Sequence, residues 1–202
     1  MQTVQENILE VALRLFIQYG VKSVTMDDLS KELGMSKKTI YQYYADKDEI
    51  VHLAVQQFLE AEEASFNAIR QKSSNTLEEI YWFSKHIKEN MQKVNGSMIY
   101  DIKKHFPKTW RLFLEHKESF FKKEIVSTIL RGKAEGYFRE DVDPELMAIL
   151  RLEQIEMCGD PEKFPSEKYS FTEVQQKFLM HFIHGMLTDK GRELLSTYFK
   201  QQ

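Results

Sequence analysis

The chain has little of what marks a secreted, membrane-spanning or zinc-binding protein. Its one cysteine, Cys158, excludes an intramolecular disulfide and has no Cys or His partner at zinc-ligand spacing. No run approaches the roughly 18 apolar residues that cross a bilayer, and the N-terminus lacks a basic segment followed by a purely apolar one. We therefore expect a cytoplasmic protein, without membrane contact, in which Cys158 is a buried structural thiol.

Catalytic and cofactor motifs are also missing. The sequence has no glycine-rich phosphate loop, no HExxH and no Ser-His-Asp order. His181 and His184 lie three apart, a spacing that can hold a metal on one helical face, but no third ligand is close in the sequence. We therefore predict no enzyme activity, no cofactor and no metal.

The chain also lacks an excess of positive charge. The chain has 28 basic and 31 acidic residues, for a net charge of −3, and residues 1–50 are acidic overall. Proteins that coat nucleic acid over a broad surface tend to be basic. Any contact with DNA must therefore be local, and the fold must separate the two signs of charge.

Helical periodicity is what the sequence does have. Apolar residues recur three and four apart, and no run alternates apolar and polar residues between turn signals, so the fold class is predicted to be all-α. Residues 160–170, with two prolines, are predicted to form a loop. About nine or ten helices are expected, at 7–19, 26–33, 37 to 43 or 44, 47 to about 72, 76 to about 94, 97–105, 107–136, 144 to about 158, 171–187 and 189–199.

The segment from Thr25 to Lys47 meets the physical requirements of a helix-turn-helix. The turn needs a residue that tolerates positive φ, and Gly34 is placed there. The close approach of the two helices needs a small side chain, which Ser30 provides, and Ile40 can fill the gap between them. An arbitrary helical hairpin, the alternative, would satisfy all these positions only occasionally.

With Ile40 pointing inward, the 3.6-residue period turns the opposite face of its helix outward. Lys donates to guanine or phosphate, Gln pairs with an adenine edge, and Thr and Tyr hydroxyls reach the DNA backbone. That face consists of Lys37, Lys38, Thr39, Gln42 and Tyr43, while the acidic residues 27, 28 and 32 fall on the supporting helix. For any single lysine, an ordinary solvated surface position is the alternative.

These motifs resemble the TetR family of repressors. The matching residues are Phe16-x-x-Tyr19-Gly20, Thr25-Met26-Asp27-Asp28-Leu29, Leu33-Gly34-Met35-Ser36, Thr39-Ile40-Tyr41-x-Tyr43-Tyr44 and Asp46-Lys47. The resemblance implies that the third helix enters the major groove, that Tyr41 and Lys47 touch phosphates and that Thr25 contacts the backbone. It also implies a DNA contact from Ser36. Tyr44 departs from the usual Phe and is expected to pack in the core with its hydroxyl at the rim.

Residues 1–47 are thus expected to form the DNA-binding domain, and residues 48–202 a helical ligand-binding and dimerisation domain. The resemblance implies that the last two long helices dimerise. Independently, the apolar stripes of these helices are wider than one core face needs, although burial within the monomer is the alternative. The candidate interface residues are Leu146, Ile149, Phe178, Phe182 and Met186. A twofold dimer predicts a near-palindromic operator with half-sites about 34–36 Å apart, or a multiple of that distance.

Aromatic residues are dense between residues 81 and 121. Together with the resemblance, this density predicts a pocket for a small apolar or amphipathic effector, although an aromatic core is the alternative for each residue. The candidate pocket residues are Trp82, Met91, Met98, Trp110, Phe113 and Phe120.

The preferred hypothesis is a homodimeric, ligand-responsive repressor that binds double-stranded operator DNA. Two alternatives remain. One is a DNA-binding regulator without a small-molecule effector, and the other is a helical ligand-binding or scaffold protein with a vestigial helix-turn-helix.

Overall fold

A computed structural model describes residues 3–90 and 95–199. Over these residues the all-α prediction is confirmed: no strand is present, and only an isolated bridge joins Phe138 to Leu187. The helices are α1 (Val4–Tyr19), α2 (Met26–Leu33), α3 (Lys37–Ile40), α4 (Lys47–Lys72), α5 (Thr76–Asn90), α6 (Ser97–His105), α7 (Pro107–His116), the π turn η1 (Lys117–Phe121), α8 (Lys122–Ala134), α9 (Pro144–Cys158), α10 (Phe171–Met186) and α11 (Asp189–Phe199). Because α7, η1 and α8 run on as one helix, the described residues form ten helices.

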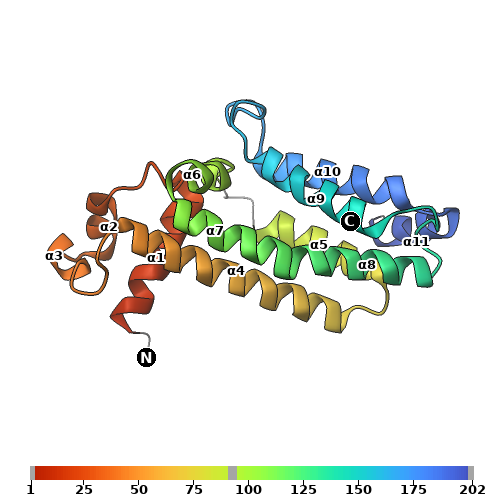
Figure 1. The fold of residues 1–202 in the computed structure, drawn as a ribbon, viewed down its shortest axis with the longest axis horizontal. Helices are drawn as coiled ribbons and strands as arrows, with labels where there is room; N and C mark the ends of the chain where they lie inside the picture. The colour runs from red at the N-terminus through yellow and green to blue at the C-terminus, as the bar shows by residue number, and fades with distance from the viewer. Residues whose placement is uncertain (1–2, 91–94, 200–202) are drawn as a thin grey trace.

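The three N-terminal helices lie at one end of an elongated molecule (Figure 1). The long helix α4 leads away from them, with α7 packed along it. Helix α9 packs on α8 and on α10, and α10 also packs on α5. None of the described helices is long and apolar enough to span a membrane. The arrangement places a small head beside a larger bundle.

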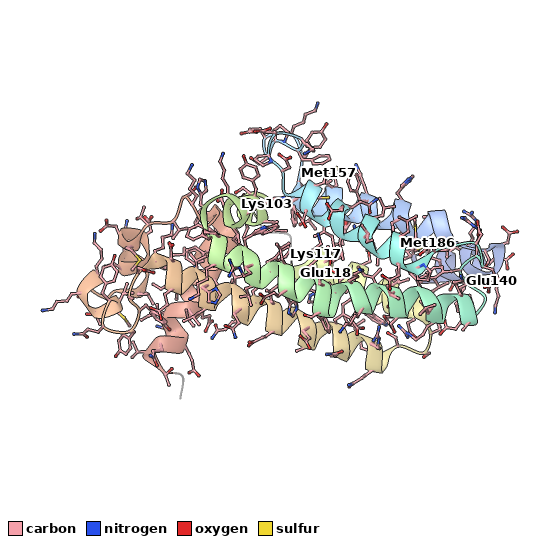
Figure 2. The ribbon with its side chains drawn as sticks, in the orientation of Figure 1. Lys103, Lys117, Glu118, Glu140, Met157 and Met186 are labelled. Atoms are coloured by element: carbon pink, nitrogen blue, oxygen red, sulfur yellow. The ribbon has the colours of Figure 1, made fainter. Side chains whose placement is uncertain are left out.

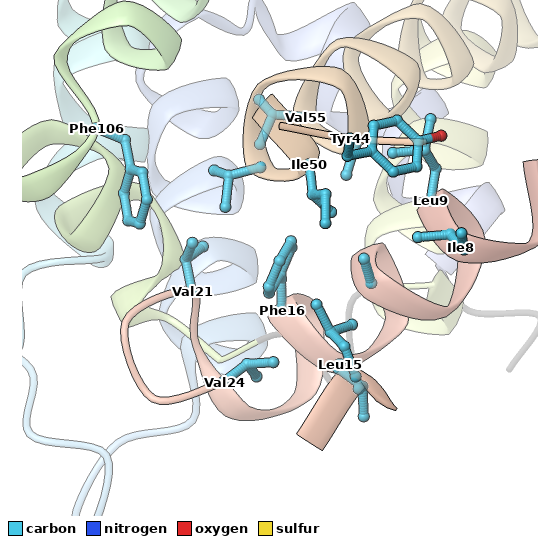
Figure 3. Close-up of a cluster of buried hydrophobic side chains, with 14 of the residues drawn as sticks. Ile8, Leu9, Leu15, Phe16, Val21, Val24, Tyr44, Ile50, Val55 and Phe106 are labelled. Atoms are coloured by element: carbon cyan, nitrogen blue, oxygen red, sulfur yellow. The ribbon is translucent and has the colours of Figure 1, made fainter. Parts of the chain in front are cut away.

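Two clusters of buried side chains form the core. The first joins the head to the start of the bundle: Ile8 and Phe16 of α1 and Ile40 of α3 pack with Ile50 of α4 and Ile102 of α6 (Figure 3). The second lies at the far end, among α5, α8, α10 and α11. The head is therefore packed against α4 and α6 through a shared apolar core.

Side-chain caps set the helix starts in the head. Helix α1 begins three residues earlier than predicted, because Thr3 and Glu6 form a capping box. The Asp46 carboxylate accepts from the backbone N–H of Glu49 (2.8 Å). The pair does not form a full capping box, because the Glu49 carboxylate accepts from Ala45 rather than from Asp46 (2.6 Å).

Helix α3 is shorter than predicted. It ends at Ile40 rather than at Tyr43 or Tyr44. Beyond Tyr41 the backbone tightens, since Gln42 and Tyr43 donate to carbonyls three residues back, at Thr39 and Ile40. The predicted outward face therefore continues past the regular helix on a tightened turn.

Gly34 holds the turn between α2 and α3. Its backbone is left-handed (φ 63°, ψ 25°), and no atom lies within 4 Å of the position that a Cβ would occupy. We expect Gly34→Ala to lower the free energy of unfolding by about 1–2 kcal/mol for backbone reasons alone. Gly34→Asn is the matched control and should lose less, because Asn tolerates this conformation. Urea unfolding measures both, and an equal loss in the two variants would contradict this assignment.

Candidate DNA-binding interface and internal cavity

The head exposes the face of α3 that the sequence predicts. Ile40 and Leu29 are fully buried, and the Ser30 hydroxyl donates to the Met35 carbonyl across the turn. On the opposite face, after the Ser36 cap, Thr39 is half-buried. The exposed residues there are Lys37, Lys38, Tyr41, Gln42 and Tyr43. This face presents two ammonium groups, an amide and two phenols to solvent, which suits contact with phosphates and base edges.

Acidic side chains of α2 are occupied by local partners. Glu32 pairs with Arg14 (2.6 Å), and Asp27 pairs with Lys37 (2.8 Å). The Asp28 carboxylate accepts from Thr25, and these hydrogen bonds lower the pKa of Asp28. Within the described residues Lys38 has no ion-pair partner. The acidic excess of the head therefore leaves the positive charge of Lys38 at the tip of α3 without a local counter-charge, while Lys37 is paired with Asp27.

Two of the predicted DNA-contacting hydroxyls are helix caps. Thr25 accepts from the backbone N–H of Asp28 (3.2 Å), and Ser36 accepts from that of Thr39 (3.1 Å). Both residues are exposed at the helix starts that flank the turn. The Tyr44 ring is buried, and its hydroxyl donates to the Gln5 carbonyl (2.9 Å), so it packs against α1 as expected.

Lys47 lies at the junction between the head and the bundle. Its ammonium donates to the Val21 carbonyl (2.6 Å) and lies 5.7 Å from the centre of the Phe106 ring. Burial lowers the pKa of Lys47. The predicted phosphate contact would require this side chain to leave Val21, and it stays a prediction.

Helix α6 provides a second contact between the head and the bundle. The carboxylate of Asp101, a buried residue of α6, accepts from the Lys22 backbone N–H just after α1 (3.1 Å). The backbone N–H of Asn95, just before α6, donates to the Ile17 carbonyl (2.6 Å). The end of α1 is therefore held by hydrogen bonds to α6 and to the residues that precede it.

The bundle contains a partly open cavity of about 220 Å³. Residues of α4 to α10, including the π turn η1, line it, and most of their side chains are apolar. Aliphatic and aromatic examples are Phe58, Phe83, Ile99, Ile102, Ile125, Leu179 and Ile183. Helix α6 therefore faces the cavity and also touches the head.

Only part of the predicted pocket lines this cavity. Met98 and Phe113 do. Trp82 lies outside it, with the ammonium of Lys72 4.4 Å from its ring centre. Trp110 and Phe120 also lie outside the lining: Trp110 stacks on Phe113, and Phe120 packs edge-on against Phe66. Met91 falls outside the described residues. Aromatic density thus marked the region, whereas helix orientation decides which rings face inward.

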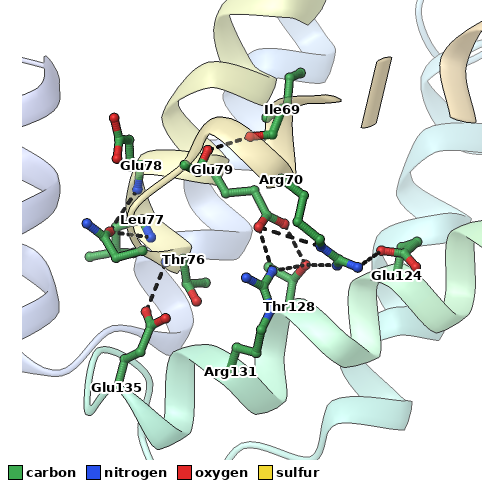
Figure 4. A network of polar contacts seen from close by, with 12 residues as sticks. Ile69, Arg70, Thr76, Leu77, Glu78, Glu79, Glu124, Thr128, Arg131 and Glu135 are labelled. Atoms are coloured by element: carbon green, nitrogen blue, oxygen red, sulfur yellow. Dashed lines mark hydrogen bonds and ion pairs between the residues drawn. The ribbon is translucent and has the colours of Figure 1, made fainter. Parts of the chain in front are cut away.

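A polar network borders one end of the cavity (Figure 4). The Glu79 carboxylate is only 2% exposed and pairs with Arg131 (2.5 Å) and, more distantly, Arg70 (3.8 Å). The Thr128 hydroxyl donates to Glu79 (3.0 Å), and Arg70 also pairs with Glu124. This network ties α4, α5 and α8 together and neutralises the buried carboxylate.

Lys117 brings a second ion pair to the cavity wall from the π turn. Its ammonium pairs with Glu153 (2.8 Å) and Glu156 of α9. Figure 2 shows Lys117 on the continuous α7–α8 helix, beside α9. These ion pairs raise the pKa of Lys117 against the opposing effect of burial. The π turn therefore links the two helices across one side of the cavity.

The head matches a known family. The model described as "Bacterial regulatory proteins, tetR family" matches residues 8–54, which include the whole turn and α3. The HTH-type transcriptional regulator YvaF of Bacillus subtilis is 27% identical over 188 residues, covering 92% of this chain and 96% of that protein. The head is a TetR-family DNA-binding domain. The chain is a DNA-binding transcription regulator, and the vestigial alternative is set aside.

Further similarities extend over the bundle. The transcriptional repressor KstR2 of Mycobacterium tuberculosis is 24% identical over 143 residues, covering 69% of this chain and 72% of that protein. The crystal structure of a TetR-family regulator from Agrobacterium tumefaciens has a TM-score of 0.74 at 17% identity, covering 91% of this chain and 97% of its own. The TetR-like fold therefore includes the cavity-bearing bundle as well as the head.

The candidate dimer residues separate into two groups. Leu146 and Ile149 of α9 are exposed, at 58% and 47%. Phe178 is half-buried on α10. Phe182 and Met186 are buried in the monomer, so their assignment to a surface needs correction. The wide stripe of α10 arises because that helix packs on both α5 and α9.

The sequence-based prediction counted Leu150 in the wide apolar stripe of its helix but missed the polar cavity residues Arg151 and Gln175. Leu150 is 44% exposed beside Ile149 on α9. Arg151 and Gln175 line the cavity and are each 4% exposed. A charged residue within an otherwise apolar helical stripe was the available signal for Arg151.

Cys158 is the buried thiol that the sequence predicts. It is 2% exposed, and burial raises its pKa from 9.0 to about 11. Because the thiolate is the nucleophile, we expect native Cys158 to react with a disulfide reagent at pH 8 roughly 100-fold more slowly than in the urea-unfolded chain. The absorbance of the released thiol measures both rates, and equal rates would contradict this assignment.

Proposed function

We propose that this TetR-family regulator is a homodimeric, effector-responsive repressor of a near-palindromic operator. One observation carries the proposal: α6 contributes Met98 and Ile102 to the cavity wall and, through Asp101, holds the head at Lys22. A ligand that displaces α6 would therefore move the head. We propose the matching domain division: residues 1–47 bind DNA, and residues 48–202 bind the effector and dimerise.

The repression mechanism depends on the spacing of two heads. In a twofold dimer, the two α3 tips read half-sites about 34–36 Å apart, or a multiple of that distance. The effector favours a state in which α6 and the heads are shifted, so that both tips no longer fit adjacent grooves at once. At saturating effector, operator affinity can fall at most by the factor by which the effector binds the shifted state more tightly than the DNA-binding state.

DNA from upstream of the chain's own gene provides the first test. Fluorescence anisotropy should show binding that weakens steeply with salt, because each lysine-phosphate contact releases counterions. A thermal-shift screen of amphipathic compounds should yield molecules that raise the Tm and also lower operator affinity. DNA binding without any such molecule would favour a regulator that has no small-molecule effector.

The α6 contact can be tested separately with Asp101→Ala. This substitution leaves the Lys22 N–H without its partner and is expected to lower stability by about 1 kcal/mol. A compound that releases wild type from the operator should still raise the Tm of Asp101→Ala, but should change its operator affinity at least about threefold less. Asp141→Ala, which breaks an exposed pair with Arg139, is the control and should respond as wild type. An unchanged response in Asp101→Ala would exclude this contact as the coupling element.

A further inference from the structure

The cavity wall contains four charged side chains, and three of them have a counter-charge. The pairs are Glu62 with His86 (3.2 Å), Glu79 with Arg131 (2.5 Å) and Lys117 with Glu153 (2.8 Å). The fourth is Arg151 of α9. Among the residues that the structure describes, no carboxylate lies within ion-pair distance of its guanidinium.

Arg151 is held in place but only partly satisfied. Its Nη2 donates to the Gln175 side-chain oxygen (3.1 Å), and the Gln175 amide nitrogen donates to the Ile155 carbonyl (3.3 Å). The Gln175 amide is thereby oriented with its oxygen toward Arg151. The Nη1 group is buried and has no hydrogen-bond partner among the described residues. The Nη1 group of the guanidinium can therefore still donate hydrogen bonds to a ligand.

Neighbouring groups do not neutralise this cation. Burial lowers the pKa of Arg151 to about 10, so the guanidinium is still protonated at neutral pH. Cys158 is the nearby titratable group, and its raised pKa of about 11 leaves the thiol uncharged. A buried charge without a counter-ion is strongly unfavourable, and an anion in the cavity would relieve it.

The rest of the wall is apolar. Phe58, Phe83, Ile125, Leu179 and Ile183 surround the space with rings and branched aliphatic chains. Such a wall excludes a small hydrated anion and favours a hydrocarbon body. The effector must therefore combine one negative group with an apolar remainder.

We propose that the effector is an amphipathic carboxylate, whose carboxylate accepts from Arg151 and whose hydrocarbon tail fills the cavity. The inference rests on the proposed effector function of this cavity and specifies the ligand class. Gln175 is the positioning residue, because it fixes one arm of the guanidinium and leaves the other for the ligand.

Three probes of equal chain length test the charge requirement by isothermal titration calorimetry: decanoate, decanol and decylammonium. Decanoate should bind wild type at least about tenfold more tightly than decanol, as expected for a hydrogen-bonded charge pair, and decylammonium should bind most weakly. From octanoate to decanoate, each added methylene should tighten binding about fourfold until the cavity is full.

Variants at Arg151 separate a ligand-binding role from a structural one. Arg151→Leu should lose the preference for decanoate over decanol, and Arg151→Lys should retain most of it. The Tm of ligand-free Arg151→Leu should equal or exceed that of wild type, because the substitution removes an uncompensated buried charge. Arg151→Gln provides a second neutral variant if the leucine variant fails to fold. Lys123→Leu removes an exposed cation of α8 and should keep the wild-type preference.

The outcomes distinguish this inference from the proposed function. If decanol or decylammonium binds as tightly as decanoate, the carboxylate assignment is overturned while the effector cavity stands. A large fall in the Tm of both neutral variants would show that Arg151 has a structural role and would also overturn the carboxylate assignment. If none of the three probes binds, and the amphipathic library also gives no Tm shift, the effector function itself fails.

Discussion

Replacing Lys37 and Tyr41 together by alanine is expected to weaken operator binding by about 100-fold or more at constant salt, without lowering the Tm. Both side chains project from the exposed face of α3, with Tyr41 46% exposed. A lysine contact with a base edge contributes about 1–3 kcal/mol and a hydrogen bond from Tyr41 to a charged phosphate about 1.5–3 kcal/mol, so removing both multiplies their effects on affinity. The ion pair between Lys37 and Asp27 is exposed, so its removal should have little effect on folding.

Anisotropy titrations at several salt concentrations measure this effect. The slope of log affinity against log salt should also become shallower by about one if Lys37 contacts a phosphate, because only the charged ammonium releases a counterion. Lys168→Ala with Tyr169→Ala is a matched control, because this pair is also exposed but lies in the loop between α9 and α10. Equal affinity of the α3 variant and the control would remove α3 from the interface.

A second large effect is expected from Leu146→Glu with Ile149→Glu, which should convert the proposed dimer to a monomer of 24.0 kDa. The three exposed apolar residues of α9, including Leu150, lie on the monomer surface with large fractions of their side chains open to solvent. Carboxylates at these positions stay hydrated in the monomer but would be buried without partners in a dimer. A single head also cannot read both half-sites, so operator affinity should fall by about 100-fold or more.

Sedimentation velocity measures the change in mass, and anisotropy measures the accompanying loss of binding. Leu114→Glu with Leu130→Glu supplies the control, since both leucines are exposed on the continuous α7–α8 helix. The control variant should remain a dimer. If instead the control dissociates and the α9 variant does not, the dimer interface lies on α7–α8.

Local signals in the sequence predicted the head well. Thr25, Ser36 and Asp46 cap the helices that follow them, because a short acceptor side chain before an apolar run has few other uses. Gly34 adopts the left-handed conformation that the turn requires, and Ile40 is fully buried. From these two positions the outward face follows by helical geometry alone.

The bundle could not be predicted to the same depth, because burial there depends on which helices are neighbours. Phe182 and Met186 resembled interface residues only because α10 has two packed faces. The surroundings of the three rings Trp82, Trp110 and Phe120 likewise depend on helix rotation. Arg151 is distinctive only once its missing counter-charge is known, and that requires the positions of all surrounding carboxylates.

The π turn at Lys117–Phe121 affects how this chain is aligned with other sequences. Such a turn holds one residue more than the α-helical turn it replaces. Alignment with a homologue whose helix is regular should therefore contain a one-residue gap at this point. Without it, every position on one side of the gap is compared with a neighbour rotated by about 100° around the helix axis. The π turn thus takes up one extra residue locally, so the positions on either side can keep the faces they would have in a regular helix.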